Sequence, residues 1–212
     1  MERSVRTTLL RCHAHTAFDP ATSKYKVTYD GRTIETTVTD KATVVEQWIR
    51  ETLSLHTESP TIVGLDIEWR PHVIRSMSNK TATLQLCIDK RCLIVQLFYI
   101  DYVPELLKDF VRNPNLTFVG VEVDGDVDKL RVEYGLECAK HEDIRELAKQ
   151  RWPGRFRRPG LKDLALEVVG LVMDKPKHVS MSNWEARVLN VNQVEYACID
   201  AYASYKIGVS LL

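Results

Sequence analysis

Two carboxylates stand inside the most hydrophobic stretch of this chain, which reads VGLDIEW over residues 63 to 69. Asp66 and Glu68 are two residues apart, so in a β-strand they share one face while Ile67 points to the other. Like charges on one face of a buried strand repel each other unless a cation lies between them. Carboxylate oxygens are hard ligands that suit Mg²⁺ or Mn²⁺. The stretch therefore predicts a divalent metal site.

Two further stretches carry groups that could complete such a site. VGVEVDGDVDKL, over residues 119 to 130, follows a buried run and contains Asp124 and Asp126 where a helix is expected to begin. Strand-to-helix junctions often supply ligand groups in α/β folds. In YACID, Tyr196 and Asp200 are four residues apart and therefore share a helix face. Alone, each pattern is common, because acids often cap helices and Tyr–Asp pairs often hydrogen bond.

Hydrophobic periodicity places these stretches on regular elements. Alternation predicts a hairpin around the turn pair Asp30-Gly31, and 3–4 spacing predicts a helix over residues 40–55. The further predicted strands are 61–69, 81–89, 91–97 and 116–121, and the further predicted helices are 102–111, 125–136, 141–152, 161–171 and 192–212. This order predicts a mixed α/β fold, with a hairpin-rich central sheet flanked by helices. We expect a flexible arm over residues 1–20 and one domain over 21–212.

The order of these motifs resembles a known family. An acid-x-acid strand, an acid after a later strand and a Tyr-x-x-x-Asp helix are together similar to the DEDD exonucleases, the DnaQ-like branch of the RNase H-like fold. The tyrosine places the chain nearest the subgroup that includes RNase D and the Werner-type exonuclease domain. The resemblance covers roughly residues 60 to 212 and rests on VGLDIEW, FVGVEVDGDVDKL and YACIDAYASY.

The resemblance implies a 3′–5′ exonuclease that hydrolyses the terminal phosphodiester and releases nucleoside 5′-monophosphates. Four carboxylates would hold two divalent cations, Mg²⁺ or Mn²⁺, and Tyr196 would orient the attacking water. Asp124 is the alternative to Asp126 at the third position. The implied catalytic residues are Asp66, Glu68, Asp126, Tyr196 and Asp200, and the four acids are the implied metal ligands.

The front of the chain, with its hairpin and helix, resembles small plant RISC-interacting clearing exoribonucleases. That narrower resemblance implies single-stranded RNA as substrate, Argonaute complexes as partners and a homo-oligomer, by analogy a ring. The alternatives are a Werner-type DNA exonuclease and a non-catalytic nucleic-acid-binding scaffold. We expect a cytoplasmic location, with the nucleus as the alternative.

Charge and composition add a candidate substrate surface. The whole chain has a formal net charge of zero, but residues 151–178 carry a net +4. RWPGRFRRP interleaves aromatic rings that can stack on bases with arginines that can contact phosphates. A solvated loop anchored by its aromatic rings is the alternative. The candidate substrate-binding residues are Trp152, Arg155, Arg157 and Arg158.

The remaining patterns exclude other classes of protein. No apolar run approaches the ~18 residues of a membrane helix, so we expect no membrane association. The five cysteines form no Cys-x-x-Cys pair, which favours reduced thiols inside a cell. Cys12, His13 and His15 lack the partner ligands of a zinc site at a known spacing.

Overall fold

One eight-stranded sheet organises the chain in this computed structural model, which describes residues 14–56, 61–72 and 78–212. The strands lie in the order β1-β2-β3-β6-β5-β4-β7-β8. β4 is therefore central, with β5 antiparallel on one side and β7 parallel on the other. The strands are β1 His15–Asp19, β2 Lys24–Tyr29, β3 Arg32–Thr39, β4 Thr61–Glu68, β5 Thr83–Ile88, β6 Arg91–Val95, β7 Leu116–Gly120 and β8 His141–Asp143.

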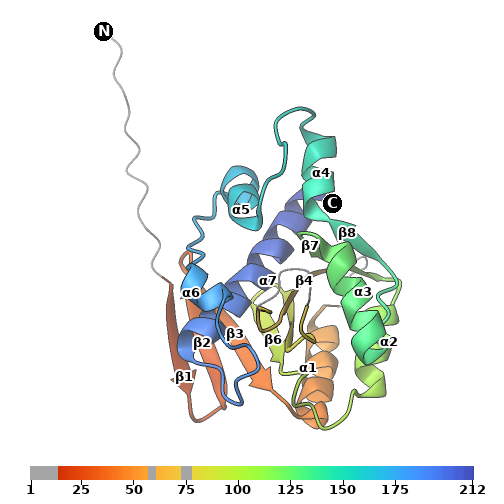
Figure 1. Cartoon of the computed structure of the whole chain (residues 1–212), viewed down its shortest axis with the longest axis vertical. Helices are drawn as coiled ribbons and strands as arrows, with labels where there is room; N and C mark the ends of the chain where they lie inside the picture. Colours follow the sequence, from red (N-terminus) through yellow and green to blue (C-terminus); the bar gives the residue numbers. More distant parts are fainter. Residues whose placement is uncertain (1–13, 57–60, 73–77) are drawn as a thin grey trace.

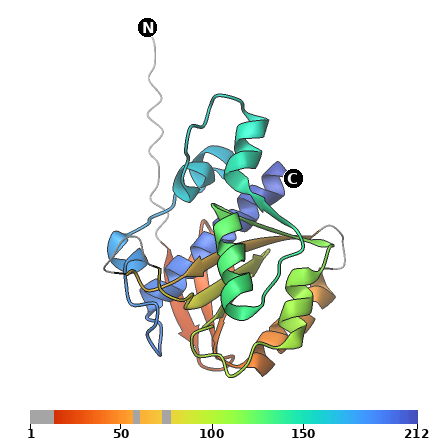
Figure 2. The same cartoon turned by 45° about the vertical axis from the view of Figure 1, so that its right-hand side comes forward.

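Helices cover both faces of the sheet (Figures 1 and 2). The first three helices share one hydrophobic core with the sheet, and the remaining helices pack into a second core on the opposite face. The long last helix, α7, crosses the strands and contacts β4 most extensively. The helices are α1 Ala42–Leu55, α2 Glu105–Arg112, α3 Val123–Tyr134, α4 Ile144–Arg151, α5 Leu161–Val169, α6 Lys177–Ser180 and α7 Val191–Leu211.

The alternation within β4 divides its side chains between the two layers. Val63, Leu65 and Ile67 are buried in the core beneath α1, α2 and α3. Gly64, Asp66 and Glu68 occupy the alternate positions and so face α7. The predicted strand, with its two acids on one face, is confirmed.

A glycine sets the distance between α7 and the central strand. A Cβ added at Gly64 would meet the carbonyl oxygen of Ala201 and lie 2.7 Å from the backbone nitrogen of Tyr205. The helix backbone therefore rests directly on the β4 backbone, which only a residue without a side chain allows. Asp200 on α7 is brought close to Asp66 on β4 by this contact.

Most predicted elements are confirmed. The hairpin turns at Asp30 and Gly31, which both have positive φ as a two-residue hairpin loop requires. Gly135 has a φ of 67° and ends α3.

Two short edge strands correct the sequence expectations. The arm expected over residues 1–20 is wrong at His15–Asp19, because these residues pair with β2 and Thr16 hydrogen bonds to Glu195 at 2.7 Å. Residues 1–13 lie outside the described residues. The helix expected from His141 begins at Ile144 instead. His141–Asp143 pairs with β7, and the Asp143 side chain caps the helix by accepting from the backbone nitrogen of Arg145.

Among the described residues, no helix is both long enough and apolar enough to cross a membrane.

Candidate active site

Strand β4 and helix α7 bring three predicted carboxylates together. One oxygen each of Asp66, Glu68 and Asp200 can be chosen so that all three lie within 4.8 Å of one another. Asp66 and Glu68 are half-buried, whereas the Asp200 side chain is only 4% exposed. Acids this close and this buried are costly in a protein interior unless a cation compensates them. The three form the carboxylate cluster.

The ionisation of the cluster reflects this crowding. Burial, followed by the charges of Asp200 and Asp126, raises the pKa of Asp66 well above its ordinary value. Burial and the charge of Asp66 raise the pKa of Glu68 to about 10. Burial also raises the pKa of Asp200, although its hydrogen bonds with Lys175 and Tyr196 act in the opposite direction. The metal-free cluster therefore retains protons that a bound cation would release.

Asp126 lies near the cluster at the start of α3. It is half-buried, and burial with the charge of Glu122 raises its pKa to about 7. Its own charge raises the pKa of Asp66 and of Glu68. Asp124 instead pairs with His141 at 3.0 Å and its side chain is 78% exposed. The geometry thus favours Asp126 over Asp124 as the fourth carboxylate, and its role as a metal ligand stays a prediction.

Tyr196 lies one helical turn before Asp200 and is 8% exposed. Its ring packs at 6.0 Å from that of Trp184, a buried residue of the segment between α6 and α7. Burial and the charge of Asp200 raise the pKa of the Tyr196 hydroxyl. The phenol therefore keeps its proton at neutral pH, which suits a hydrogen-bond donor better than a base.

Lys175 was counted from the sequence only among the basic residues of 151–178, and its place at the carboxylates was not predicted. It precedes α6, and its Nζ lies 2.5 Å from Asp200 Oδ2 and 5.1 Å from the centre of the Tyr196 ring. Burial alone would lower its pKa, but the charges of Asp200 and Asp66 outweigh burial and raise it. No hydrophobic period marks a loop lysine, so its position could be found only from the folded chain.

The donor set fits divalent cations. The cluster offers carboxylate oxygens alone, which favour Mg²⁺ or Mn²⁺ over zinc. A fourth acid, Asp126, acts electrostatically on two of the three. Four such acids carry enough negative charge to hold two divalent cations.

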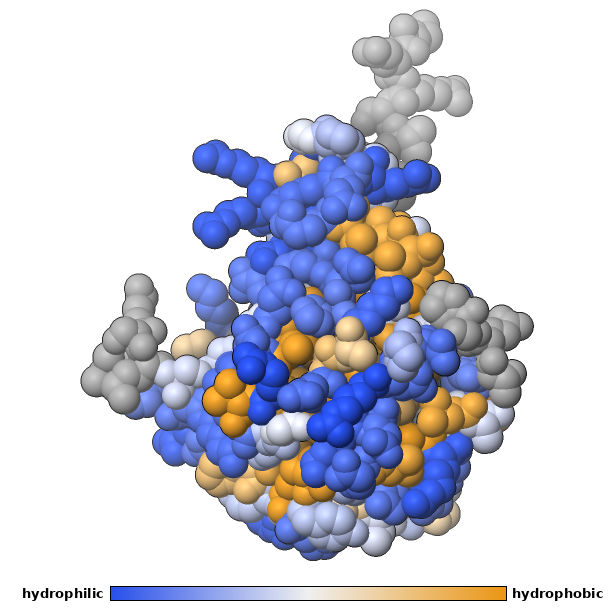
Figure 3. Space-filling model, turned by 90° about the vertical axis from the view of Figure 1, so that its right-hand side faces the viewer, coloured by the Kyte–Doolittle hydropathy of each residue, from blue (hydrophilic) through white to orange (hydrophobic). Residues whose placement is uncertain are grey.

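The basic segment between α4 and α5 forms a separate surface. Both flanking helices pack against α7. Arg155 pairs with Glu167, and its guanidinium lies 5.9 Å from the Trp152 ring and 5.6 Å from the Phe156 ring. Figure 3 shows hydrophilic residues gathered at the upper end of the molecule, where α4 and α5 lie in Figure 1. Arg157 and Arg158 are exposed and line a hollow with Arg155, but neither forms an ion pair within the described part of the chain.

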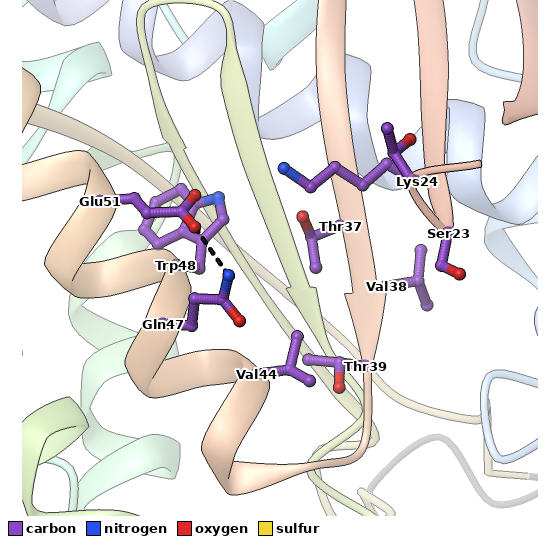
Figure 4. Close-up of a pocket in the computed structure, with 10 residues that line it drawn as sticks. Ser23, Lys24, Thr37, Val38, Thr39, Val44, Gln47, Trp48 and Glu51 are labelled. Carbon is purple, nitrogen blue, oxygen red and sulfur yellow. Dashed lines mark hydrogen bonds between the residues drawn. The ribbon is translucent and has the colours of Figure 1, made fainter. Parts of the chain in front are cut away.

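A second hollow lies away from the carboxylate cluster. It is bounded by α1 and by β2 and β3, and its lining includes Lys24, Trp48 and Glu51 (Figure 4). Gln47 donates to Glu51 at 2.8 Å within it. None of the predicted catalytic residues lines this hollow. Of the excluded zinc motif, Cys12 and His13 lie outside the described residues and His15 lies in β1.

Comparison with known proteins agrees with this geometry. A family model described as "3'-5' exonuclease" matches residues 36–212. This chain belongs to the 3′–5′ exonuclease family. The DnaQ-like exonucleases work with two divalent cations, and the carboxylates of this chain fit that requirement.

Individual relatives extend the comparison. A 3′–5′ exonuclease of Arabidopsis thaliana is 36% identical over 147 residues, which cover 68% of this chain and 50% of the relative. The mouse bifunctional 3′–5′ exonuclease/ATP-dependent helicase WRN is 26% identical over 163 residues, covering 74% of this chain and 11% of that protein. This chain thus spans half or less of these two curated relatives.

Among solved structures, Escherichia coli RNase D, titled an exoribonuclease involved in structured RNA processing, matches with a TM-score of 0.68 and 21% identity. The match covers 82% of this chain and 44% of RNase D. At that identity the likeness shows the fold alone, and it confirms the RNase H-like prediction.

The raised pKa values predict how metal-free stability depends on pH. Asp126 and Glu68 have folded pKa values of about 7 and about 10, above their ordinary values of 3.8 and 4.5. The folded state therefore binds more protons than the unfolded state above pH ~4, so stability falls as pH rises through the folded pKa values. We expect the melting temperature in chelator to be lower at pH 9 than at pH 6 by at least about 3 °C, equal to ~1 kcal/mol.

Acids with lowered pKa values, such as Asp101 and Glu105, lose their contribution only at acidic pH and leave this range unaffected. Mn²⁺ should raise the melting temperature more at pH 8 than at pH 6, because ligands must lose protons to bind it. Scanning calorimetry checks both effects. A melting temperature that is constant or rises from pH 6 to pH 9 in chelator would contradict the buried-acid account.

Proposed function

We propose that this chain hydrolyses the 3′-terminal phosphodiester of single-stranded RNA and releases nucleoside 5′-monophosphates. The observation that carries the proposal is the convergence of Asp66, Glu68 and Asp200 within 4.8 Å, one turn of helix from Tyr196. Within the described residues, Lys175 and Tyr196 hydrogen bond to Asp200, and no ion pair holds Asp66 or Glu68. Membership of the 3′–5′ exonuclease family supports the direction of hydrolysis.

The residues have distinct roles in this reaction. Asp66, Glu68, Asp200 and Asp126 would hold two divalent cations, which when bound make a water molecule more acidic and stabilise charge on the phosphate and on the leaving 3′ oxygen. Tyr196 would keep its hydroxyl proton and hold the attacking water in line with the phosphorus atom. A hollow beside Tyr196, lined also by Pro176, His178 and Asn192, supplies room for a terminal nucleotide.

The basic segment is proposed to hold the strand behind the terminal nucleotide. Arg157→Glu should raise KM about 3- to 10-fold with little change in kcat, because an exposed arginine that contacts phosphate contributes binding and no chemistry. The salt dependence of binding should lose about one unit of slope. We choose Arg157 over Arg155 because Arg155 already pairs with Glu167. Lys90→Glu, at an exposed residue in the turn between β5 and β6 that forms no ion pair within the described residues, is the matched control.

If Arg157→Glu changes neither KM nor the salt dependence of binding, the basic segment is a solvated loop anchored by its aromatic rings.

The choice of RNA over DNA rests on the resemblance to small plant exoribonucleases. A DNA substrate is the second candidate, favoured by the similarity to the mouse exonuclease–helicase. The test is hydrolysis of RNA and DNA strands of one sequence, in Mg²⁺ and in Mn²⁺, compared by kcat/KM. A higher value for RNA supports the proposal, and a higher value for DNA replaces it with the Werner-type function. All five predicted catalytic positions carry the residue types that the reaction needs, which argues against a non-catalytic scaffold.

The same resemblance leads us to propose a role in clearing small-RNA products together with Argonaute complexes. It also leads us to propose a homo-oligomer, by analogy a ring, and a cytoplasmic location with the nucleus as the alternative. These proposals rest on sequence resemblance.

A further inference from the structure

Lys175 forms an unusually buried ion pair within the carboxylate cluster. Its Nζ lies 2.5 Å from Asp200 Oδ2, and the two side chains are 29% and 4% exposed. Asp200 is the least exposed acid of any ion pair formed by the described residues. Burying such a pair costs desolvation free energy, and removing only one partner leaves the other charge buried without compensation.

The charge of Lys175 acts on the whole cluster. Its ammonium group contacts Asp200, and one oxygen of Asp200 lies within 4.8 Å of oxygens of Asp66 and Glu68. The ammonium group of Lys175 therefore stands where a cation is needed to hold the three acids close together.

A divalent cation and this ammonium group cannot both sit on the same oxygen without cost. A metal held by Asp200 Oδ2 would share that oxygen with Lys175 Nζ, which already lies 2.5 Å from it. Two cations so close repel each other, and the low dielectric of a buried site strengthens the repulsion. The long, flexible lysine side chain can turn away when the metal enters.

We propose that Lys175 is a built-in counter-ion of the metal site. It holds the carboxylate cluster together in the metal-free protein, and a divalent cation displaces it from Asp200. Lys175 thereby sets the metal concentration at which the site fills. The inference rests on the proposed function only in taking these carboxylates as metal ligands, and its test needs no substrate.

The test is a Mn²⁺ titration at pH 8, in the absence of nucleic acid, by calorimetry and by electron paramagnetic resonance. Lys175→Met keeps the length of the side chain and removes its charge. We expect Mn²⁺ to bind this variant about 10-fold more tightly than the wild type, and the metal-free melting temperature to fall. Lys177→Met, two residues away and exposed, should match the wild type. Lys175→Arg keeps the charge and should stay within about 3-fold of the wild type.

Each outcome decides the inference. Unchanged or weaker Mn²⁺ binding by Lys175→Met overturns it. The inference is also overturned if Lys175→Met binds a nucleoside 5′-monophosphate more weakly than the wild type in Ca²⁺ while its Mn²⁺ affinity is unchanged. Lys175 would then be a phosphate ligand. A Lys175→Met protein that folds only with Mn²⁺ supports the inference, and one that stays unfolded with Mn²⁺ contradicts it. If the wild type and Lys175→Met bind Mn²⁺ as expected but the wild type does not hydrolyse nucleic acid, only the proposed function is contradicted.

Discussion

Asp66→Asn is expected to lower kcat/KM on a single-stranded oligonucleotide by at least ~10³-fold, equal to ~4 kcal/mol of transition-state stabilisation. Asparagine has the shape of aspartate but lacks the charge that holds a divalent cation. The variant should remain folded. Its metal-free melting temperature should rise, because the folded protein holds Asp66 in surroundings that disfavour its charge. The rise in melting temperature caused by Mn²⁺ should shrink or vanish.

Asp109→Asn on α2 is the matched control, since Asp109 is exposed and lies on the opposite layer. It should match the wild type in kcat/KM and in melting temperature. Activity of Asp66→Asn within tenfold of the wild type would contradict the placement of the active site on β4.

Gly64→Ala is expected to have the largest effect on stability. Its new methyl group would overlap the backbone of α7 at Ala201 and approach the Tyr205 nitrogen to 2.7 Å. Neither neighbour is a flexible side chain that could turn away, so the helix must shift from the strand. We expect a loss of about 3 kcal/mol in the free energy of unfolding, which for a domain of this size is roughly 6–12 °C in melting temperature. The shift would also separate Asp200 from Asp66.

Gly125→Ala is the control for this substitution. A Cβ at Gly125 meets nothing within 4 Å, and the residue lies inside α3. Alanine there should leave the protein as stable or more stable, by about 0.5–1 kcal/mol. Equal stabilities of the two variants would show that α7 does not rest on β4 as closely as described.

The relative placement of residues within one strand or one helix could be predicted from sequence, because it follows the side-chain repeat of that element. Asp66 and Glu68 share a face because strands alternate, and Tyr196 and Asp200 share one because helices repeat near four residues. Both pairs are confirmed as neighbours in space. The resemblance then supplied which acids belong together across the chain.

Residues outside such periods could not be predicted in the same way. The choice between Asp124 and Asp126 depended on His141, which holds Asp124 away at the surface. Lys175 lies in an irregular segment, where sequence gives no direction for a side chain. The strand β8 has three residues, too few for alternation to show. Asp143, a helix-capping residue type just before Ile144, was a usable signal for the true start of α4.

We infer that the carboxylate cluster performs metal-dependent hydrolysis from the 3′ end. Incubation of the purified protein with 5′-labelled single-stranded RNA and DNA, in Mn²⁺ or in chelator, tests it most directly. We predict a ladder of labelled strands that shortens one nucleotide at a time in Mn²⁺ and is absent in chelator and with Asp66→Asn. No shortening of either strand in Mn²⁺, or equal shortening in chelator, would contradict the account.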